Sequence, residues 1–123
     1  NNVSGFPFIF RGALDAGAGK INEEMKLAAA RSIAALAKEP VPAEILAMYG
    51  QKDVTFGIDY VIPKALDFRL LEWEAPAVAQ AAMDTGVATK KLDMAQYKKE
   101  LRARIDAEHK RINAFIDSYN LGF

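Results

Sequence analysis

Apolar residues recur every three or four positions over long stretches of this 123-residue chain. Residues 21–39 show the pattern most clearly, because the spacing gives a helix one apolar face: Ile21, Met25, Ala29, Ile33 and Leu36. We expect Asn22 to cap this helix, since an asparagine side chain can accept a hydrogen bond from the free N–H groups of the first turn. Pro40 and Pro42 should end it.

The longest predicted helix follows Asp93 and runs to the end of the chain. Asp93 with Gln96 three residues later resembles a capping box. The apolar stripe of this helix contains Met94, Tyr97, Leu101, Ile105, Ile112, Phe115, Ile116 and Tyr119. Two pairs of opposite charge stand four residues apart on its other faces: Glu100 with Arg104, and Asp106 with Lys110.

Proline and glycine positions predict three shorter helices. Pro7 is expected in the first turn of a helix that reaches Leu14. Residues 42–50 and 75–86 each have a proline near the start and a glycine at the end. Alternation over residues 58–62 predicts a short extended segment. The chain as given is therefore expected to be mainly α, with about four to five helices and at most one short strand.

Composition narrows the function classes. Lys and Arg together number 16, as do Asp and Glu, so the net charge is zero and a nucleic-acid partner is not expected. The chain contains no uncharged stretch of 18 apolar residues, so a membrane span is not expected. The chain has no cysteine, which excludes disulfides, thiolate zinc sites and a cysteine nucleophile within it. The absence also fits a cytoplasmic location.

Few residues belong to a recognisable chemical motif. The run GAGK at residues 17–20 is too short for a phosphate loop and is interpreted as a connection. His109, the only histidine, stands among charged residues and is expected to be solvated. Trp73 is interpreted as a packing residue, with a partner contact as the alternative. Capping or surface positions explain most of the scattered acids: Asp15, Glu23, Glu24, Asp59, Asp67, Glu72 and Glu74.

Asn1 and Asn2 are the strongest candidates for a binding role. An amide offers one acceptor and two donors, so it can hold a carboxylate or a cofactor amide without adding a charge. The two residues could instead cap a helix that starts near Phe6 or Pro7, and the spacing alone favours the cap. The chain starts on these amides without a Met and runs directly into an aromatic stretch. That pattern is typical of a segment buried within a larger protein.

Four segments, in order, resemble the C-terminal part of the bacterial malic enzymes: NNVSGFPFIFRGALD, INEEMKLAAARSIAALA, FGIDYVIPKALDFRLL and APAVAQAAMDTGVA. The resemblance covers residues 1 to about 88. The family usually reads IPKPFDPRL where this chain reads IPKALDFRL, so Ala65 and Phe68 replace prolines. Four residues of that motif are kept: Pro63, Lys64, Asp67 and Arg69.

The resemblance implies an oxidoreductase that decarboxylates malate to pyruvate with NAD or NADP and a divalent metal, Mg²⁺ or Mn²⁺. It implies that residues 1–88 form the helical, C-terminal part of a Rossmann-like α/β NAD(P)-binding domain, and that residues 89–123 form a C-terminal helical extension. By the family pattern, Asn2 contacts the substrate and Asn1 lies on the cofactor side. The family's catalytic Tyr and Lys, its metal ligands and its Gly-rich turn lie upstream and match nothing in this chain.

The resemblance also implies partners. The remainder of a malic enzyme chain would complete the active site and cover the phenylalanines near the start, and a homodimer or larger assembly is expected. A hypothesis of another class is a self-contained helical interaction module without catalysis, in which the last helix mediates dimerisation. The apolar stripe of that helix motivates it, although Glu108 interrupts the stripe. The mass of the intact parent polypeptide would discriminate the two.

Overall fold

The structure, a computed structural model, describes the backbone of residues 2–50, 55–57, 60, 62–63 and 67–118, and their side chains except those of residues 2–6 and 116. The described residues form five α-helices and no strand of a sheet, so the mainly α prediction is confirmed. The helices are α1 (Asn2–Asp15), α2 (Glu23–Ala37), α3 (Ala43–Met48), α4 (Arg69–Asp84) and α5 (Met94–Ser118). None of the described helices is both long and apolar enough to cross a membrane.

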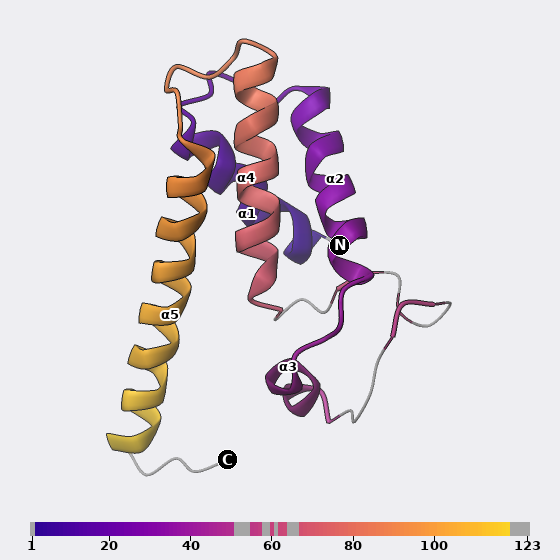
Figure 1. Ribbon diagram of the computed structural model, residues 1–123, viewed down its shortest axis with the longest axis vertical. Coiled ribbons are helices and arrows are strands. Elements are labelled where there is room, and N and C mark those ends of the chain that lie inside the picture. Colours follow the sequence, from indigo (N-terminus) through magenta and orange to yellow (C-terminus); the bar gives the residue numbers. More distant parts are fainter. Residues whose placement is uncertain (1, 51–54, 58–59, 61, 64–66, 119–123) are drawn as a thin grey trace.

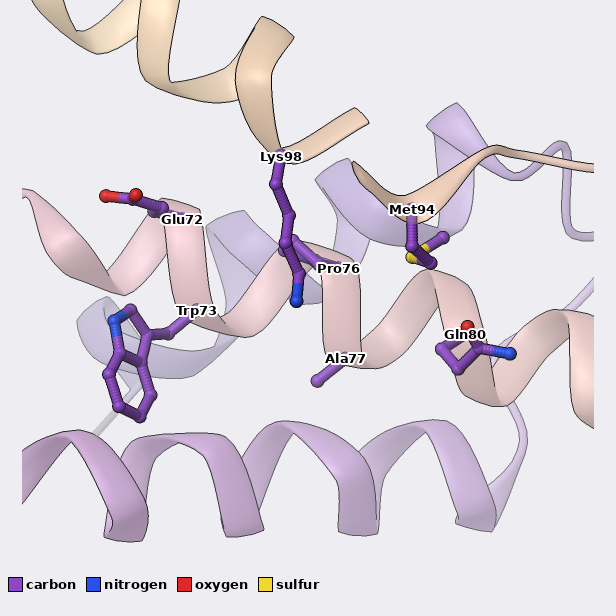
Figure 2. A pocket seen from close by; sticks show the side chains of 7 residues that line it. All are labelled: Glu72, Trp73, Pro76, Ala77, Gln80, Met94 and Lys98. Atoms are coloured by element: carbon purple, nitrogen blue, oxygen red, sulfur yellow. The ribbon is translucent and has the colours of Figure 1, made fainter. Parts of the chain in front are cut away.

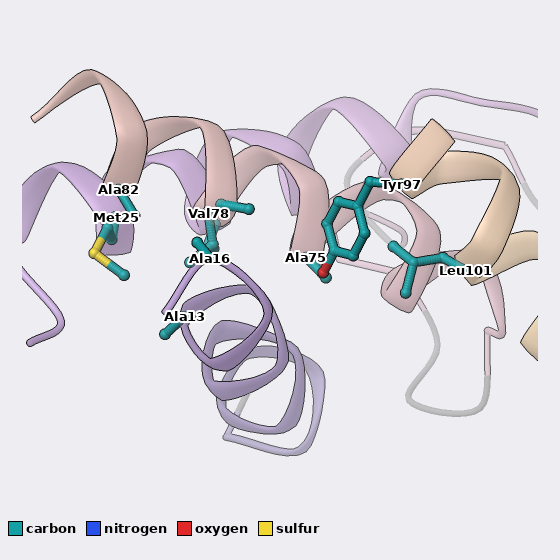
Figure 3. Packing of buried hydrophobic residues seen from close by; sticks show 10 residues of the cluster. Ala13, Ala16, Met25, Ala75, Val78, Ala82, Tyr97 and Leu101 are labelled. Atoms are coloured by element: carbon teal, nitrogen blue, oxygen red, sulfur yellow. The ribbon is translucent and has the colours of Figure 1, made fainter. Parts of the chain in front are cut away.

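Helix α4 is the centre of the molecule. It packs most extensively against α2 and α1, and α5 lies along another side (Figure 1). Small residues make this close arrangement possible, because Ala75, Ala79 and Ala82 are fully buried on α4. Figure 3 shows the side chains that meet around α4: Ala13 from α1, Ala16 just after α1, Met25 from α2, Ala75, Val78 and Ala82 from α4, and Tyr97 and Leu101 from α5.

Two helices begin earlier than their prolines predict. Helix α1 begins at Asn2, so Pro7 lies inside it rather than in its first turn. Helix α4 begins at Arg69, six residues before the predicted start, and Pro76 lies in its interior. Proline inside a helix removes one backbone hydrogen bond, a cost that tertiary packing can offset. The burial of Pro76 is consistent with that explanation.

The predicted ends of α2, α3 and α4 are largely confirmed. The Asn22 side chain accepts a hydrogen bond from the Met25 N–H at 3.0 Å. Pro42 precedes α3, and Gly50 follows it with φ of 65°. Gly86 follows α4 with φ of 78°, the left-handed conformation that glycine adopts without strain.

Helix α5 is capped by Asp93, whose carboxylate accepts hydrogen bonds from the Ala95 and Gln96 N–H groups at 3.0 and 3.2 Å. The return half of the predicted capping box is different, because the Gln96 side chain donates to Glu100 instead. Asp106 pairs with Arg102 rather than providing the predicted link to Lys110. Along the stripe, Tyr97, Leu101 and Ile105 are buried, whereas Ile112 and Phe115 are exposed.

Of the predicted extended segment at residues 58–62, the structure describes Tyr60 and Ile62. Gly57 and Tyr60 exchange two backbone hydrogen bonds of 3.1 Å in an isolated bridge. Ile62 is exposed, and Ile58 lies outside the described residues.

Candidate functional site

The two predicted site residues stand at the head of α1. Asn1 lies outside the described residues, and Asn2 is the first residue of the helix, with a side chain that is not described. The predicted start of this helix near Phe6 or Pro7 was wrong, because the helix starts at Asn2. The first turn of a helix has free N–H groups and the positive end of the helix dipole.

The direction of α1 is fixed where it crosses α4. A Cβ atom on Gly12 would lie 2.5 Å from the Ala75 carbonyl oxygen and 2.9 Å from Val78 Cβ. Real side chains do not tolerate such distances, so the two helix backbones approach each other closely only because residue 12 is glycine. Ala13 and Ala16 continue the same buried contact toward the end of α1.

A polar network joins the end of α1 to α5. The Tyr97 hydroxyl donates a hydrogen bond of 2.6 Å to Asp15 Oδ2, and Arg11 Nε donates to the same oxygen at 2.9 Å. Tyr97 is only 5% exposed. Burial, and then the hydrogen bond to the Asp15 carboxylate, raise the pKa of Tyr97 above its ordinary value of 10.0. The phenol therefore remains a donor at any physiological pH.

The glycine-containing loop after α1 is structural, as predicted. The Gly19 N–H donates to the Val87 carbonyl at 3.1 Å, and the Ala18 N–H donates to Ala13. In return, Thr89 and Lys90 donate their N–H groups to the carbonyls of Gly17 and Ala16. A phosphate loop must present free N–H groups to its ligand. Because these groups bind other carbonyls, the loop does not fit a cofactor pyrophosphate.

Two of the scattered acids are buried, which the surface interpretation did not predict for Glu74. Asp67 is 1% exposed and accepts hydrogen bonds from the Arg69 backbone N–H at 3.0 Å and from two nitrogens of the Arg69 guanidinium at 3.0 and 2.8 Å. Arg69 also donates to the Pro40 carbonyl at 2.9 Å. This network connects the start of α4 to the chain that leaves α2.

Glu74 is fully buried, and neither carboxylate oxygen has a hydrogen-bond partner. Burial raises the pKa of Glu74 to about 8, since the charged form is deprived of water. Sequence reasoning missed this residue. The signal was its position midway between Leu70 and Val78, four residues from each, which is the spacing of a buried face.

His109 is half-buried rather than solvated. Its ring meets the Phe68 ring edge-on, with centroids 5.0 Å apart. The Arg102 guanidinium lies 5.9 Å from the centroid of the same ring. Phe68, which stands where the resembling family has a proline, therefore connects the start of α4 to α5.

A groove of about 550 Å³ runs between α4 and α5 (Figure 2). Trp73, Ala77 and Gln80 of α4 line it, and Lys98 stands on the α5 side. Glu72, at its edge, binds Arg102 at 3.1 Å. The groove is open and mixed in polarity, and Trp73 is partly buried in it. The structure thus supports packing by Trp73.

Metal binding needs several ligands that converge on one point. Within the described part of the chain, no group of three or more His, Asp or Glu side chains converges in this way. The described residues therefore do not fit the divalent metal that the resemblance implies.

Comparison with known proteins extends the sequence resemblance. Models of protein families gave no match. The NADP-dependent malic enzyme of Salmonella typhimurium is 50% identical over 121 residues, which are 98% of this chain and 15% of that enzyme. The NADP-dependent malic enzyme of Escherichia coli is 59% identical over 90 residues, or 73% of this chain and 12% of that enzyme. The chain matches a segment of the malic enzymes.

Solved structures agree with this assignment. Malic enzyme from Pyrococcus horikoshii has a TM-score of 0.69 and 33% identity over 97% of this chain and 24% of that one. Entamoeba histolytica malic enzyme has a TM-score of 0.71 and 28% identity over 96% of this chain and 22% of that one. The chain thus spans less than a quarter of either structure, and these matches include most of α5.

Proposed function

We propose that this chain is part of an enzyme that oxidises and decarboxylates malate to pyruvate and CO₂, with NAD or NADP as the hydride acceptor. The observation that carries the proposal is 50% identity over nearly the whole chain to an NADP-dependent malic enzyme. A Rhizobium meliloti relative at 56% identity is NAD-dependent, so the match leaves both nicotinamide cofactors open. Mg²⁺ or Mn²⁺ would serve as the metal.

The chemistry would come from other parts of that enzyme. The described residues hold no converging metal ligands, and the N–H groups of the glycine loop are used internally. In our proposal residues 1–88 complete an NAD(P)-binding domain, and residues 89–123 extend it. Asn2 would contact malate, and Asn1 would lie beside the cofactor, as the resemblance implies. The free N–H groups at the start of α1 are compatible with an anionic ligand there.

The remainder of the enzyme would cover the outer face of α1. Ala13 and Ala16 face α4, yet Phe10 is 51% and Leu14 is 71% exposed. A helix that is apolar on all sides is usually buried on all sides. Polypeptide beyond this chain is the natural cover, since the relatives are several times longer.

Turnover measurements test the dependence on the remainder. The isolated 123-residue chain, given malate, NAD or NADP and Mn²⁺, should form no reduced nicotinamide, whereas the complete enzyme should. Turnover by the isolated chain would refute this part of the proposal.

The Asn2→Ala variant of the complete enzyme tests the substrate contact. Loss of one hydrogen bond to a charged ligand costs about 1.5–3 kcal/mol, so kcat/KM for malate should fall about 10- to 100-fold. Asn113→Ala is the matched control, because Asn113 is exposed on α5. Equal kinetics for the two variants would reject a role for Asn2 in the malate site.

A helical interaction module without catalysis remains the second candidate, because Ile112 and Phe115 are 52% and 57% exposed on α5. A parent polypeptide of 13.5 kDa that unfolds cooperatively would favour it, and a much heavier one would favour the enzyme. The homodimer is part of our proposal and would be tested by sedimentation of the complete enzyme. We also propose a cytoplasmic location, which the lack of cysteine supports.

A further inference from the structure

We propose that Tyr97 and Asp15 are positioning residues for the malate site, because their hydrogen bond sets the direction of the helix whose first residue is Asn2. This inference rests on the proposed function. It also gives the segment after residue 88 a role in the reaction, although that segment contains no residue of the predicted site.

The hydrogen bond between Tyr97 and Asp15 is short and shielded from water. Its hydroxyl–carboxylate distance of 2.6 Å is typical of a charge-assisted hydrogen bond. Arg11 holds the same carboxylate oxygen at 2.9 Å, so Asp15 is restrained from two directions. The Tyr97 ring is buried and reaches toward Ala75 from α5 (Figure 3). Water therefore competes little for this bond.

Helix α1 transmits this restraint to Asn2. It is continuous from Asn2 to Asp15, with Pro7 inside it. Asp15 is thirteen positions after Asn2, so at about 1.5 Å per residue the two ends lie about 20 Å apart. A tilt of about 3° at one end therefore moves the other by about 1 Å. A displacement of about 1 Å would stretch a hydrogen bond of about 3 Å beyond the distance at which it forms, so malate should bind more weakly.

Contacts at Gly12 and Asp15 determine the tilt together. Gly12 fixes the distance between α1 and α4, and its close contact with the Ala75 carbonyl leaves no room for a side chain. Asp15, one turn later, fixes the direction through α5. A change at either point should therefore move the head of α1 without touching Asn2.

The test is the kinetics of Tyr97→Phe in the complete enzyme. This variant keeps the buried ring and loses only the donor, so the contact of Asn2 with malate should weaken and KM for malate should rise about tenfold while kcat changes less. Gly12→Ala should also raise KM for malate, because the new methyl group would push α1 away from the Ala75 carbonyl of α4. Asp15→Asn keeps an acceptor for the Tyr97 hydroxyl, so its KM for malate should lie between those of the parent and of Asp15→Ala.

Arg102→Gln is the matched control. Arg102 connects α5 to Glu72 of α4 at 3.1 Å, so its loss loosens α5 without releasing α1. Arg102→Gln removes a half-exposed ion pair and should lose less thermal stability than Tyr97→Phe, and KM should rise only in Tyr97→Phe. Equal KM values for these two variants would overturn the inference, since a purely structural bond would predict that result.

A double variant separates this inference from the proposed function. If Tyr97 acts through Asn2, Tyr97→Phe should cost nothing further in the Asn2→Ala background. Additive losses would overturn the positioning role and leave the proposed function standing. A silent Asn2→Ala variant would instead reject the proposed malate contact.

Discussion

The two ends of the helical body are built differently. At the upper end in Figure 1, the loops at residues 16–19 and 87–90 exchange backbone hydrogen bonds, although about 70 residues separate them in the chain. We call these two loops the paired-loop end. The opposite end contains α3 and the distal half of α5, and we call it the open end. Large apolar side chains are exposed there: Met48, Ile112 and Phe115.

The difference indicates which contacts the segment makes for itself. Polar groups at the paired-loop end find partners within the segment, such as Asn22, whose amide donates to Thr85 Oγ1 at 2.8 Å. Nearer the open end, Asp67 is fully partnered by Arg69, but Glu74 is buried without any partner. We therefore expect the first half of α4 to be the less stable part of the core.

The largest expected effect is a pH dependence that Glu74 imposes on α4. The folded state keeps the Glu74 proton up to a pKa of about 8, whereas an unfolded glutamate loses it above 4.5. Between these values unfolding releases a proton, so stability should fall by about 1.4 kcal/mol per pH unit as the pH rises. Hydrogen exchange of α4 amides in the complete enzyme, compared between pH 6 and 8, measures this fall.

Glu74→Leu is the informative variant. Leucine removes the buried carboxyl, so α4 should open less readily at pH 8, and the difference between the two pH values should shrink. A parent and a variant with the same pH dependence would show that Glu74 is not the titrating group.

An effect of similar size contrasts a core leucine with a surface leucine. Leu101 is fully buried in the cluster near the paired-loop end, so Leu101→Ala should cost about 2–5 kcal/mol. Leu14→Ala, at a residue that is 71% exposed within this segment, should cost less than about 0.5 kcal/mol in the isolated chain. Urea unfolding of the two variants tests the contrast, and equal costs would contradict the core described above.

The smallest effect concerns the cap of α2. Asn22→Ala removes the hydrogen bond to the Met25 N–H and the link to Thr85, and should cost about 1 kcal/mol. The melting temperature of the complete enzyme measures this loss of stability, with Asn113→Ala as the control variant. If the two variants melt together, the contacts of Asn22 contribute little to the paired-loop end.

The sequence predicted helices well where local chemistry decides, and less well where packing does. The caps at Asn22 and Asp93 and the left-handed Gly86 depend on neighbouring residues, so pattern reasoning found them. Helix α4 starts seven residues before its proline because tertiary contacts support the extra turns. Intrinsic helix propensities do not include such tertiary contacts, so they could not predict the earlier start.

The candidate site was predictable only in part. Asn2 came from resemblance and is the first residue of α1, while the predicted helix start near Phe6 or Pro7 was wrong. The bond between Tyr97 and Asp15 spans 82 residues, and no spacing rule connects residues that far apart. The burial of Glu74 was missed because an acidic residue on an amphipathic helix usually lies on the solvent-exposed face.

The central claim is that this segment is completed by polypeptide that covers the outer face of α1. Because the chain has no cysteine, Leu14→Cys gives it a single thiol, and Lys99→Cys on the exposed side of α5 serves as control. Mass spectrometry would follow the labelling of each thiol in the isolated chain and in the complete enzyme. We predict that the thiol at position 14 reacts much more slowly in the complete enzyme, while the thiol at position 99 reacts alike in both. Equal labelling at position 14 in the two proteins would contradict the claim.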